Sequence, residues 1–326
     1  MMRARAPRLA IALGDPRGIG PEITARALAE PFRAEVTVIG AEDQIAPLQA
    51  SHTISVGSWG LGSGDGTSDR SRAIRAGRIA GNAVEAAVKL ALDGRVDAIV
   101  TAPAQKHALH LAGFPYPGHT EWLAHLAGDV DVAMMLAAEA NPSDRNGHPL
   151  RVVLVTTHVP LRDVPALLTL ERVVRTGRVV QRALREWWGI EQPRLAVCAL
   201  NPHAGEAGLF GDEEARVLSP AATRLEAAGP FPADTVFVRA MRGEFDAVLA
   251  PYHDVGMTAI KVAAFGRAVN VTLGLPFPRT SPDHGTAFDI AGTGEADASS
   301  MRAALELAAR LAERRKAETS PLPRPP

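Results

Sequence analysis

The sequence has little cysteine and no excess of charge of either sign. The single cysteine, Cys198, excludes an internal disulfide framework and a zinc site built from paired thiolates. Its neighbours in residues 195–200 are mostly apolar, which favours an inert core thiol over a reactive one. With 35 Lys and Arg against 36 Asp and Glu, the net charge is -1. The chain therefore offers no basic field to hold a nucleic acid or a membrane surface.

Long hydrophobic runs and phosphate-binding fingerprints are absent too. No stretch approaches the ~20 apolar residues that a membrane span needs, and the apolar residues before Gly14 end far short of a signal peptide's cleavage site. We therefore expect a cytoplasmic protein. No P-loop signature occurs, and the glycines of residues 51–70 never form G-x-G-x-x-G, which predicts a surface loop there rather than a phosphate cradle.

Alternating patterns predict an α/β fold. A chain of 326 residues suggests about two domains. Short apolar runs alternate with longer segments of helical period, which is typical of βα units and a mostly parallel sheet. The predicted strands are residues 9–13, 35–39, 98–101, 132–136, 151–156, 194–199, 247–250 and 268–273. The predicted helices are clearest at residues 79–92, 164–188, 213–228 and 301–315. Pro21 marks the first turn of a further helix after the first strand.

Three histidines, His158, His203 and His253, share one setting. Each follows a predicted strand, with one to three residues between, in a turn marked by Pro or Gly. In open α/β sheets the carboxyl ends of the strands line the ligand crevice, so the three side chains could converge on a metal ion. Neutral imidazole suits zinc, cobalt, nickel or iron better than magnesium, and three protein ligands leave positions open for a substrate oxygen. Ordinary loop histidines are the alternative.

Further polar residues accompany these histidines. His119 and Thr120 stand at an expected helix start, where capping alone would explain the threonine. Arg279 lies in a proline-flanked turn suited to presenting its guanidinium to a phosphate or carboxylate, although a solvated surface arginine is the simpler interpretation. Together with Lys261 and Asn270, Arg279 brackets the last predicted strand.

Five segments in a fixed order resemble one known family. They are the G-D-P-x-G-I-G-P-E run at residues 14–22, G-H-T-E at 118–121, N-P-H-A-G-E at 201–206, H-D-x-G at 253–256 and the polar loop at 283–294. Together they are similar to 4-hydroxythreonine-4-phosphate dehydrogenases, the NAD-dependent enzymes of pyridoxal phosphate biosynthesis. The resemblance runs from about residue 9 to residue 298. Arg17 departs from it, because a small residue is usual there.

The resemblance implies two α/β/α domains with mostly parallel sheets, like those of isocitrate and isopropylmalate dehydrogenases, with the active site in the interdomain cleft. We place one domain, on the NAD-binding side, at residues 1–120 plus 275–326. The metal-binding and dimerisation domain is placed at residues 121–274. The resemblance also implies a homodimer with active sites shared between chains.

The family pattern further implies roles for individual residues. His158 and His203 of one chain and His253 of the other would hold a divalent ion: zinc, cobalt or magnesium. The expected binding residues for a small phosphorylated amino acid are His119, Thr120, Lys261, Asn270 and Arg279. The expected binding residues for NAD, or NADP, are Gly14, Asp15, Asp283, His284, Gly285, Ala287, Asp289 and Gly292.

The implied reaction oxidises 4-phosphooxy-L-threonine to 2-amino-3-oxo-4-phosphooxybutanoate, which decarboxylates to 3-amino-2-oxopropyl phosphate. The proton acceptor stays open among Asp234, Lys261 and bound water. Related dehydrogenases of 4-phosphoerythronate, 4-phosphothreonate or a cyclic diol dicarboxylate are alternatives. A three-histidine zinc hydrolase and a non-catalytic phosphometabolite sensor are alternatives of other classes.

Overall fold

The structure, a computed structural model, describes residues 5–60, 68–140, 147–264 and 266–319. The chain divides into two compact units, Met1–Val130 with Leu275–Pro326, and Asp131–Gly274. The second unit thus begins at Asp131, ten residues after the boundary predicted at residue 121. Within the described part of the chain, no helix has both the length and the apolar character needed to cross a membrane.

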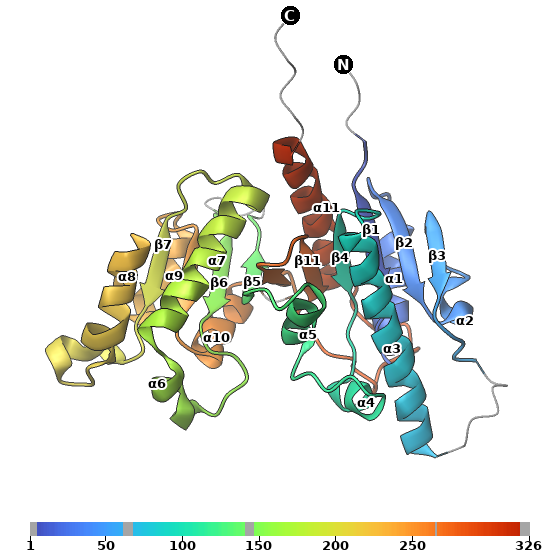
Figure 1. The fold of residues 1–326 in the computed structure, drawn as a ribbon, viewed down its shortest axis with the longest axis horizontal. Coiled ribbons are helices and arrows are strands. Elements are labelled where there is room, and N and C mark those ends of the chain that lie inside the picture. Colours follow the sequence, from blue (N-terminus) through green and yellow to red (C-terminus); the bar gives the residue numbers. More distant parts are fainter. Residues whose placement is uncertain (1–4, 61–67, 141–146, 265, 320–326) are drawn as a thin grey trace, which may run out of the picture. The chain divides into compact units, whose positions relative to one another are not determined.

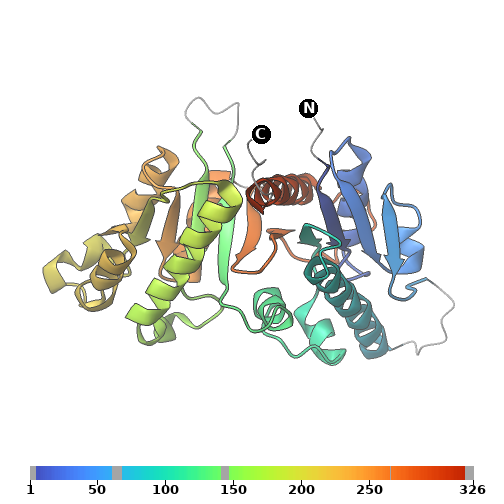
Figure 2. The same cartoon turned by 45° about the horizontal axis from the view of Figure 1, so that its top comes forward.

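The first unit is built on five parallel strands in the order β3-β2-β1-β4-β11. Their bounds are β1 Arg8–Ala12, β2 Glu35–Gly40, β3 His52–Ser55, β4 Ala98–Thr101 and β11 Arg279–Pro282. All four residues of β4 are buried, because helices cover both faces of a parallel sheet. Figures 1 and 2 show α3 and α11 on opposite faces of these strands. The helices are α1 Gly20–Ala29, α2 Glu42–Ile45, α3 Asp69–Leu92, α4 Lys106–Leu111, α5 His119–Leu126 and α11 Ser299–Thr319.

The strands of the second unit follow the order β10-β5-β6-β9-β7-β8. Strand β5 runs antiparallel to both of its neighbours, and the other described pairs in this unit are parallel. The bounds are β5 Ala133–Ala138, β6 Leu150–Leu154, β7 Leu195–Cys198, β8 Ala228–Phe231, β9 Ala247–Ala250 and β10 Val269–Leu273. The mostly parallel α/β class predicted from the sequence is confirmed.

Helices also cover both faces of the second sheet. Figure 1 shows α7 in front of it and α10 behind it. The helical elements are η1 Leu161–Asp163, α6 Val164–Leu167, α7 Leu170–Trp188, η2 Pro202–Gly208, η3 Glu214–Leu218, α8 Ser219–Leu225, α9 Ala233–Met241 and α10 His253–Ala264.

Several predicted boundaries were wrong. The helix expected at residues 79–92 begins at Asp69, because the Ser68 hydroxyl accepts a hydrogen bond from the Ser71 N–H and caps it. The loop expected at residues 51–70 therefore contains β3 and the start of α3, and its residues 61–67 lie outside the described residues. The helix expected at residues 164–188 is interrupted, because Thr169 caps a new helix that starts at Leu170.

Candidate active site

His158 and His253 lie close together within the second unit. His158 follows β6 and His253 begins α10 directly after β9, and these two strands are parallel neighbours. The two imidazole rings have centroids 5.5 Å apart, with 44° between their planes. Nδ1 of His253 is 2.7 Å from Oδ1 of Asp254. A carboxylate at one ring nitrogen orients the imidazole and leaves Nε2 for a ligand.

This histidine pair fits a shared metal ion. A zinc–nitrogen bond is about 2.0–2.1 Å long, so two imidazoles on one ion have centroids roughly 5–6 Å apart. The observed separation of 5.5 Å lies in that range. The donor set of neutral nitrogens suits zinc or cobalt better than magnesium.

His203, the third predicted ligand, follows β7, which is the parallel neighbour of β9. The strands before all three histidines are thus adjacent, in the order β6-β9-β7. From His203 to Ala207 the backbone is left-handed throughout, with φ between 43° and 81°. For a residue with a Cβ this conformation costs about 1–2 kcal/mol, and such strain concentrates at functional sites. Among the described residues, no three His, Cys, Asp or Glu side chains form a group that could hold a metal ion.

A buried carboxylate that no sequence motif indicated anchors this strained turn. Glu214 is 5% exposed. Its Oε1 accepts hydrogen bonds from the Leu200 N–H at 2.9 Å and the Asn201 N–H at 2.8 Å. Its Oε2 accepts from the side-chain amide of Asn201 at 2.9 Å. Glu214 therefore fixes the exit of β7 from which His203 departs.

In the first unit, His119 and Arg279 interact electrostatically. Arg279 is 3% exposed and donates from Nη2 to the Thr101 hydroxyl at 2.6 Å. Burial lowers the pKa of Arg279 to about 10, so its guanidinium stays charged at neutral pH. Burial, followed by the charges of Arg279 and Lys106, lowers the pKa of His119 to about 3. His119 keeps some exposure as a residue, but its Nε2 is buried and has no hydrogen-bond partner among the described residues.

Two interpretations of these residues were wrong. Thr120 is not the cap of its helix, because α5 begins at His119 and its N-cap is Gly118, which has no side chain. Arg279 is not a solvated arginine in a turn, since it opens β11 and pairs with Ile99 of β4. Thr120 is thereby left available for another role, and Arg279 presents a desolvated charge.

The remaining substrate candidates lie in the second unit. Lys261 is half-buried in α10 and Asn270 is half-buried in β10. The side-chain oxygen of Asn270 is buried and accepts no hydrogen bond from the described residues. Asp234 is exposed in the first turn of α9, where a carboxylate favours the helix N-terminus without any catalytic role.

The glycine-bearing turn at residues 14–22 contains the first two cofactor candidates. Gly14 has φ 73°, and a Cβ there would clash with the Pro103 carbonyl, so only glycine fits. Asp15 is fully buried, and both of its carboxylate oxygens accept hydrogen bonds from Arg17. Contacts within the protein therefore explain why Gly14 and Asp15 stand at these positions, without any contribution from a cofactor.

The other cofactor candidates form the described loop at residues 283–294. Asp283 and His284 are half-buried, and Gly285 and Asp289 are exposed. Nε2 of His284 is buried and has no hydrogen-bond partner within the part of the chain that the structure describes, which leaves it open to a ligand. Ala287 has φ 41°, an unusual value for a residue with a Cβ. The loop therefore combines backbone strain with an unsatisfied polar atom, a pairing that fits a binding segment.

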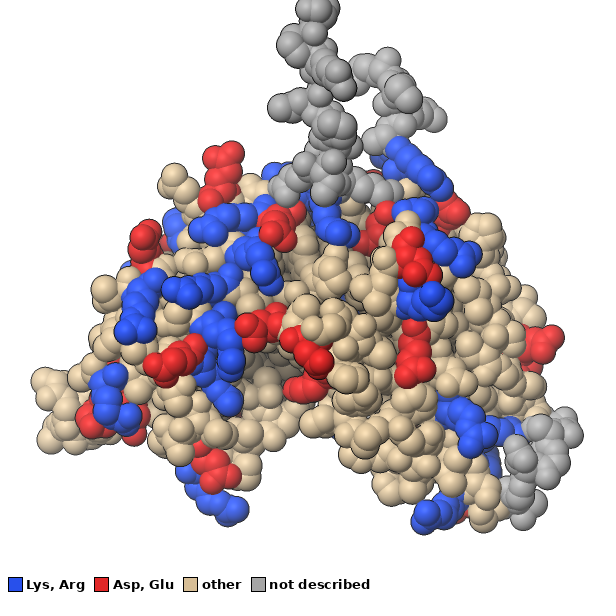
Figure 3. Space-filling model, in the orientation of Figure 1, with Lys and Arg blue, Asp and Glu red and all other residues tan. Residues whose placement is uncertain are grey.

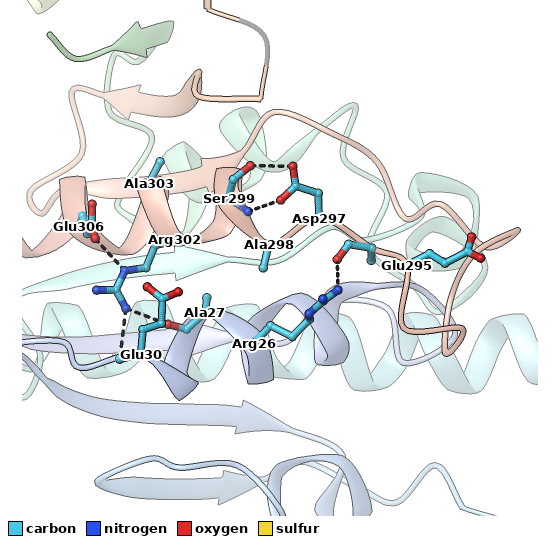
Figure 4. Close-up of a pocket in the computed structure, with 11 residues that line it drawn as sticks. Arg26, Ala27, Glu30, Glu295, Asp297, Ala298, Ser299, Arg302, Ala303 and Glu306 are labelled. Atoms are coloured by element: carbon cyan, nitrogen blue, oxygen red, sulfur yellow. Dashed lines mark hydrogen bonds and ion pairs between the residues drawn. The ribbon is translucent and has the colours of Figure 1, made fainter. Parts of the chain in front are cut away.

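Open grooves also lie elsewhere on the described part of the chain. One of about 690 Å³ runs between α1 and the start of α11. Figure 4 shows Arg302 pointing at the backbone carbonyl of Ala27. Arg26 donates to the Ala296 carbonyl, so both arginines have a structural role. The second, of about 490 Å³, is lined by three arginines of α7 and by Arg224. Figure 3 shows these basic side chains gathered over α7, a local feature that the balanced net charge did not indicate.

Comparisons with known proteins agree with the motifs. A sequence profile described as pyridoxal phosphate biosynthetic protein PdxA matches residues 22–308. The 4-hydroxythreonine-4-phosphate dehydrogenase of Burkholderia vietnamiensis is 43% identical over 337 residues, covering 97% of this chain and 100% of the relative. The crystal structure of the enzyme of that name from Klebsiella pneumoniae is 42% identical, with a TM-score of 0.79, and covers 94% of this chain and 100% of its own. A terephthalate 1,2-cis-dihydrodiol dehydrogenase from Burkholderia xenovorans is 30% identical, with a TM-score of 0.63, and covers 94% and 98%. The chain therefore belongs to the PdxA family, as its sequence motifs indicated.

Proposed function

We propose that the chain is a 4-hydroxythreonine-4-phosphate dehydrogenase. It oxidises the secondary alcohol of 4-phosphooxy-L-threonine with NAD or NADP, and the 2-amino-3-oxo-4-phosphooxybutanoate formed loses carbon dioxide to give 3-amino-2-oxopropyl phosphate. The observation that best supports this function is the set of curated relatives of that name, 41–45% identical over at least 93% of this chain.

Five charged and polar side chains would bind the substrate. Arg279 and Lys261 neutralise its anionic groups, since charge-assisted hydrogen bonds to carboxylate or phosphate are the strong ones. The low pKa of His119 keeps its imidazole neutral at neutral pH. Its buried Nε2 can therefore form a hydrogen bond with the substrate without adding a charge to the site. Thr120 and Asn270 complete the set and fix orientation.

Two bound groups would supply the remaining chemistry. NAD or NADP, held by the candidate residues of the turn after β1 and of the loop at residues 283–294, would supply the acceptor for the hydride of the alcohol carbon. His158, His203 and His253 would hold a divalent ion, which would supply Lewis acidity for the oxidation of the alcohol and for the decarboxylation. Asp234, Lys261 or a water takes the hydroxyl proton.

The histidine geometry allows two ways of sharing the metal in a homodimer. In the family pattern, His253 comes from the other chain. Because His158 and His253 lie 5.5 Å apart in one chain, the partner could instead contribute His203. Mixing inactive single variants distinguishes the two. His158→Ala with His253→Ala regains activity only in the first arrangement, and His158→Ala with His203→Ala regains activity only in the second.

NADH formation with a panel of substrates tests the function. We expect 4-phosphooxy-L-threonine to react with the highest kcat/KM, above 4-phosphoerythronate, 4-phosphothreonate and a cyclic diol dicarboxylate. A preference for the diol would favour the activity of the Burkholderia xenovorans relative. Turnover of any substrate by hydrolysis without NADH would support the zinc hydrolase, and binding without turnover would support a sensor.

A further inference from the structure

Arg17 connects a buried carboxylate to the loop at residues 283–294. Its Nε and Nη2 donate to the two oxygens of Asp15 at 2.9 and 2.7 Å. Nη2 also donates to the Gln105 side-chain oxygen at 2.8 Å. The guanidinium lies over the ring of Phe288, with its central carbon 5.0 Å from the ring centroid. One side chain thus contacts the turn after β1, the start of α4 and the loop.

The same turn holds the loop through further contacts. The Ile19 N–H donates to the Thr286 carbonyl at 3.0 Å. The Gly292 N–H donates to the Glu22 carboxylate at 3.0 Å. These hydrogen bonds fix the loop on either side of Phe288, and the guanidinium covers the ring between them. The loop is therefore clamped to residues 17–22.

A counter-ion role for Asp15 alone does not explain this arrangement. Any cation within reach could neutralise the carboxylate, and it would need no contact with the loop. A planar guanidinium can bond a carboxylate in its plane while its face stacks on an aromatic ring, which an ammonium cannot do. Phe288 is 40% exposed, so the ring is not held by burial in the core.

We propose that Arg17 is a positioning residue that holds the loop at residues 283–294 in the conformation that binds the dinucleotide. The inference rests on the proposed function for the identity of the ligand. A loop ordered before binding loses less conformational freedom when the ligand arrives, so Arg17 strengthens dinucleotide binding without touching the dinucleotide. Substrate binding by the residues proposed above does not depend on it.

Three variants test this role. Arg17→Lys keeps a positive charge for Asp15 but loses the planar fork. Phe288→Ala removes the ring and leaves the ion pair intact. Arg75→Ala is the matched control, because Arg75 also stacks on a ring, that of Trp59 at 4.5 Å, in the same unit. Hydrogen–deuterium exchange of the dinucleotide-free protein reports the order of the loop, and titration calorimetry gives the Kd for NAD.

In both test variants we expect faster exchange within residues 283–294. We also expect the Kd for NAD to rise roughly three- to tenfold, because that change corresponds to the loss of a partly exposed cation–π contact and of the loop order that it supports. The apparent affinity for the substrate and the values for Arg75→Ala should stay unchanged. Unchanged loop exchange in folded Arg17→Lys and Phe288→Ala overturns the clamp. An effect of Arg17→Lys without any effect of Phe288→Ala would assign the role of Arg17 to its hydrogen bonds with Asp15 and Gln105 rather than to its contact with the loop, and also overturns the clamp. Wild-type protein that binds neither NAD nor NADP overturns the proposed function, whatever the exchange data show.

Discussion

Replacing His119 by asparagine should remove a specific acid sensitivity of the fold. The folded pKa of His119 is about 3, against about 6.5 in an unfolded chain, because burial and the charges of Arg279 and Lys106 oppose protonation. Between these two values the unfolded state binds more protons, so the free energy of unfolding falls as the pH falls through that window. At pH 5, which is 1.5 units below the unfolded pKa, the loss is at most about 2 kcal/mol. Above about pH 7 the contribution is constant.

Urea denaturation at pH 7.5 and pH 5 measures this difference. Wild type should lose more stability than His119→Asn between the two conditions, by up to about 2 kcal/mol. His125→Asn is the matched control, because His125 lies in the same helix with an exposed side chain. NMR titration of the imidazole adds a direct observation. A His119 ring that protonates near pH 6.5, or equal losses in wild type and His119→Asn, would refute the reasoning.

Three further predictions concern metal, substrate and thiol. Chelation should abolish turnover and zinc or cobalt should restore it, whereas full activity in protein shown metal-free by elemental analysis would exclude the site on His158, His203 and His253. Arg279→Ala should lower kcat/KM for the substrate by about ten- to a hundredfold and leave the Kd for NAD unchanged, because charged hydrogen bonds contribute about 1.5–3 kcal/mol. Loss of NAD binding instead would assign Arg279 to the cofactor site. Cys198 is fully buried, and burial with the nearby Glu214 raises its pKa to about 12, so a thiol reagent should label it only after unfolding, and labelling of the native protein would contradict the inert role.

The sequence predicted those parts of the fold that depend on local pattern. Strands β4 and β9 appear at the predicted residues, because a strand buried on both faces is a continuous apolar run bounded by polar turns. Strands β8 and β11 were missed, since A-G-P-F and R-T-S-P lack such a run. Pairing with neighbours already in the sheet, rather than intrinsic propensity, makes these segments strands.

In the candidate site, too, only the features that depend on local sequence pattern could be predicted. Strand-end histidines are visible in sequence, and the structure brings His158 and His253 together. That Arg279 is buried was not visible, because its burial follows from the parallel pairing of β11 with β4, which are far apart in the chain. The role of Arg17 needed the loop at residues 283–294 to fold back on it. Residue type and local spacing indicate which groups can act, but only long-range packing decides their surroundings.

Glu214 shows the consequence of such packing and allows a last prediction. Its carboxylate satisfies three donors at the exit of β7. Glu214→Ala leaves the two backbone N–H groups without that acceptor, whereas the Asn201 amide keeps its bond to Glu213. Each buried unsatisfied group costs about 1–3 kcal/mol, so a loss of at least about 2 kcal/mol in stability is expected. Glu214→Gln can retain one oxygen for both backbone N–H groups and should cost far less.

If this turn holds His203 in place, zinc affinity must fall in the same order, from wild type through Glu214→Gln to Glu214→Ala. Competition with a chromophoric chelator measures this affinity in the folded variants. Glu213→Gln is the matched control, because Glu213 accepts from the same Asn201 amide at 2.7 Å, but the turn's two backbone N–H groups bond Glu214 instead. Equal zinc affinity in all four proteins would show that His203 does not depend on Glu214, and equal losses in Glu213→Gln and Glu214→Gln would assign the effect to the Asn201 side chain rather than to the backbone of the turn.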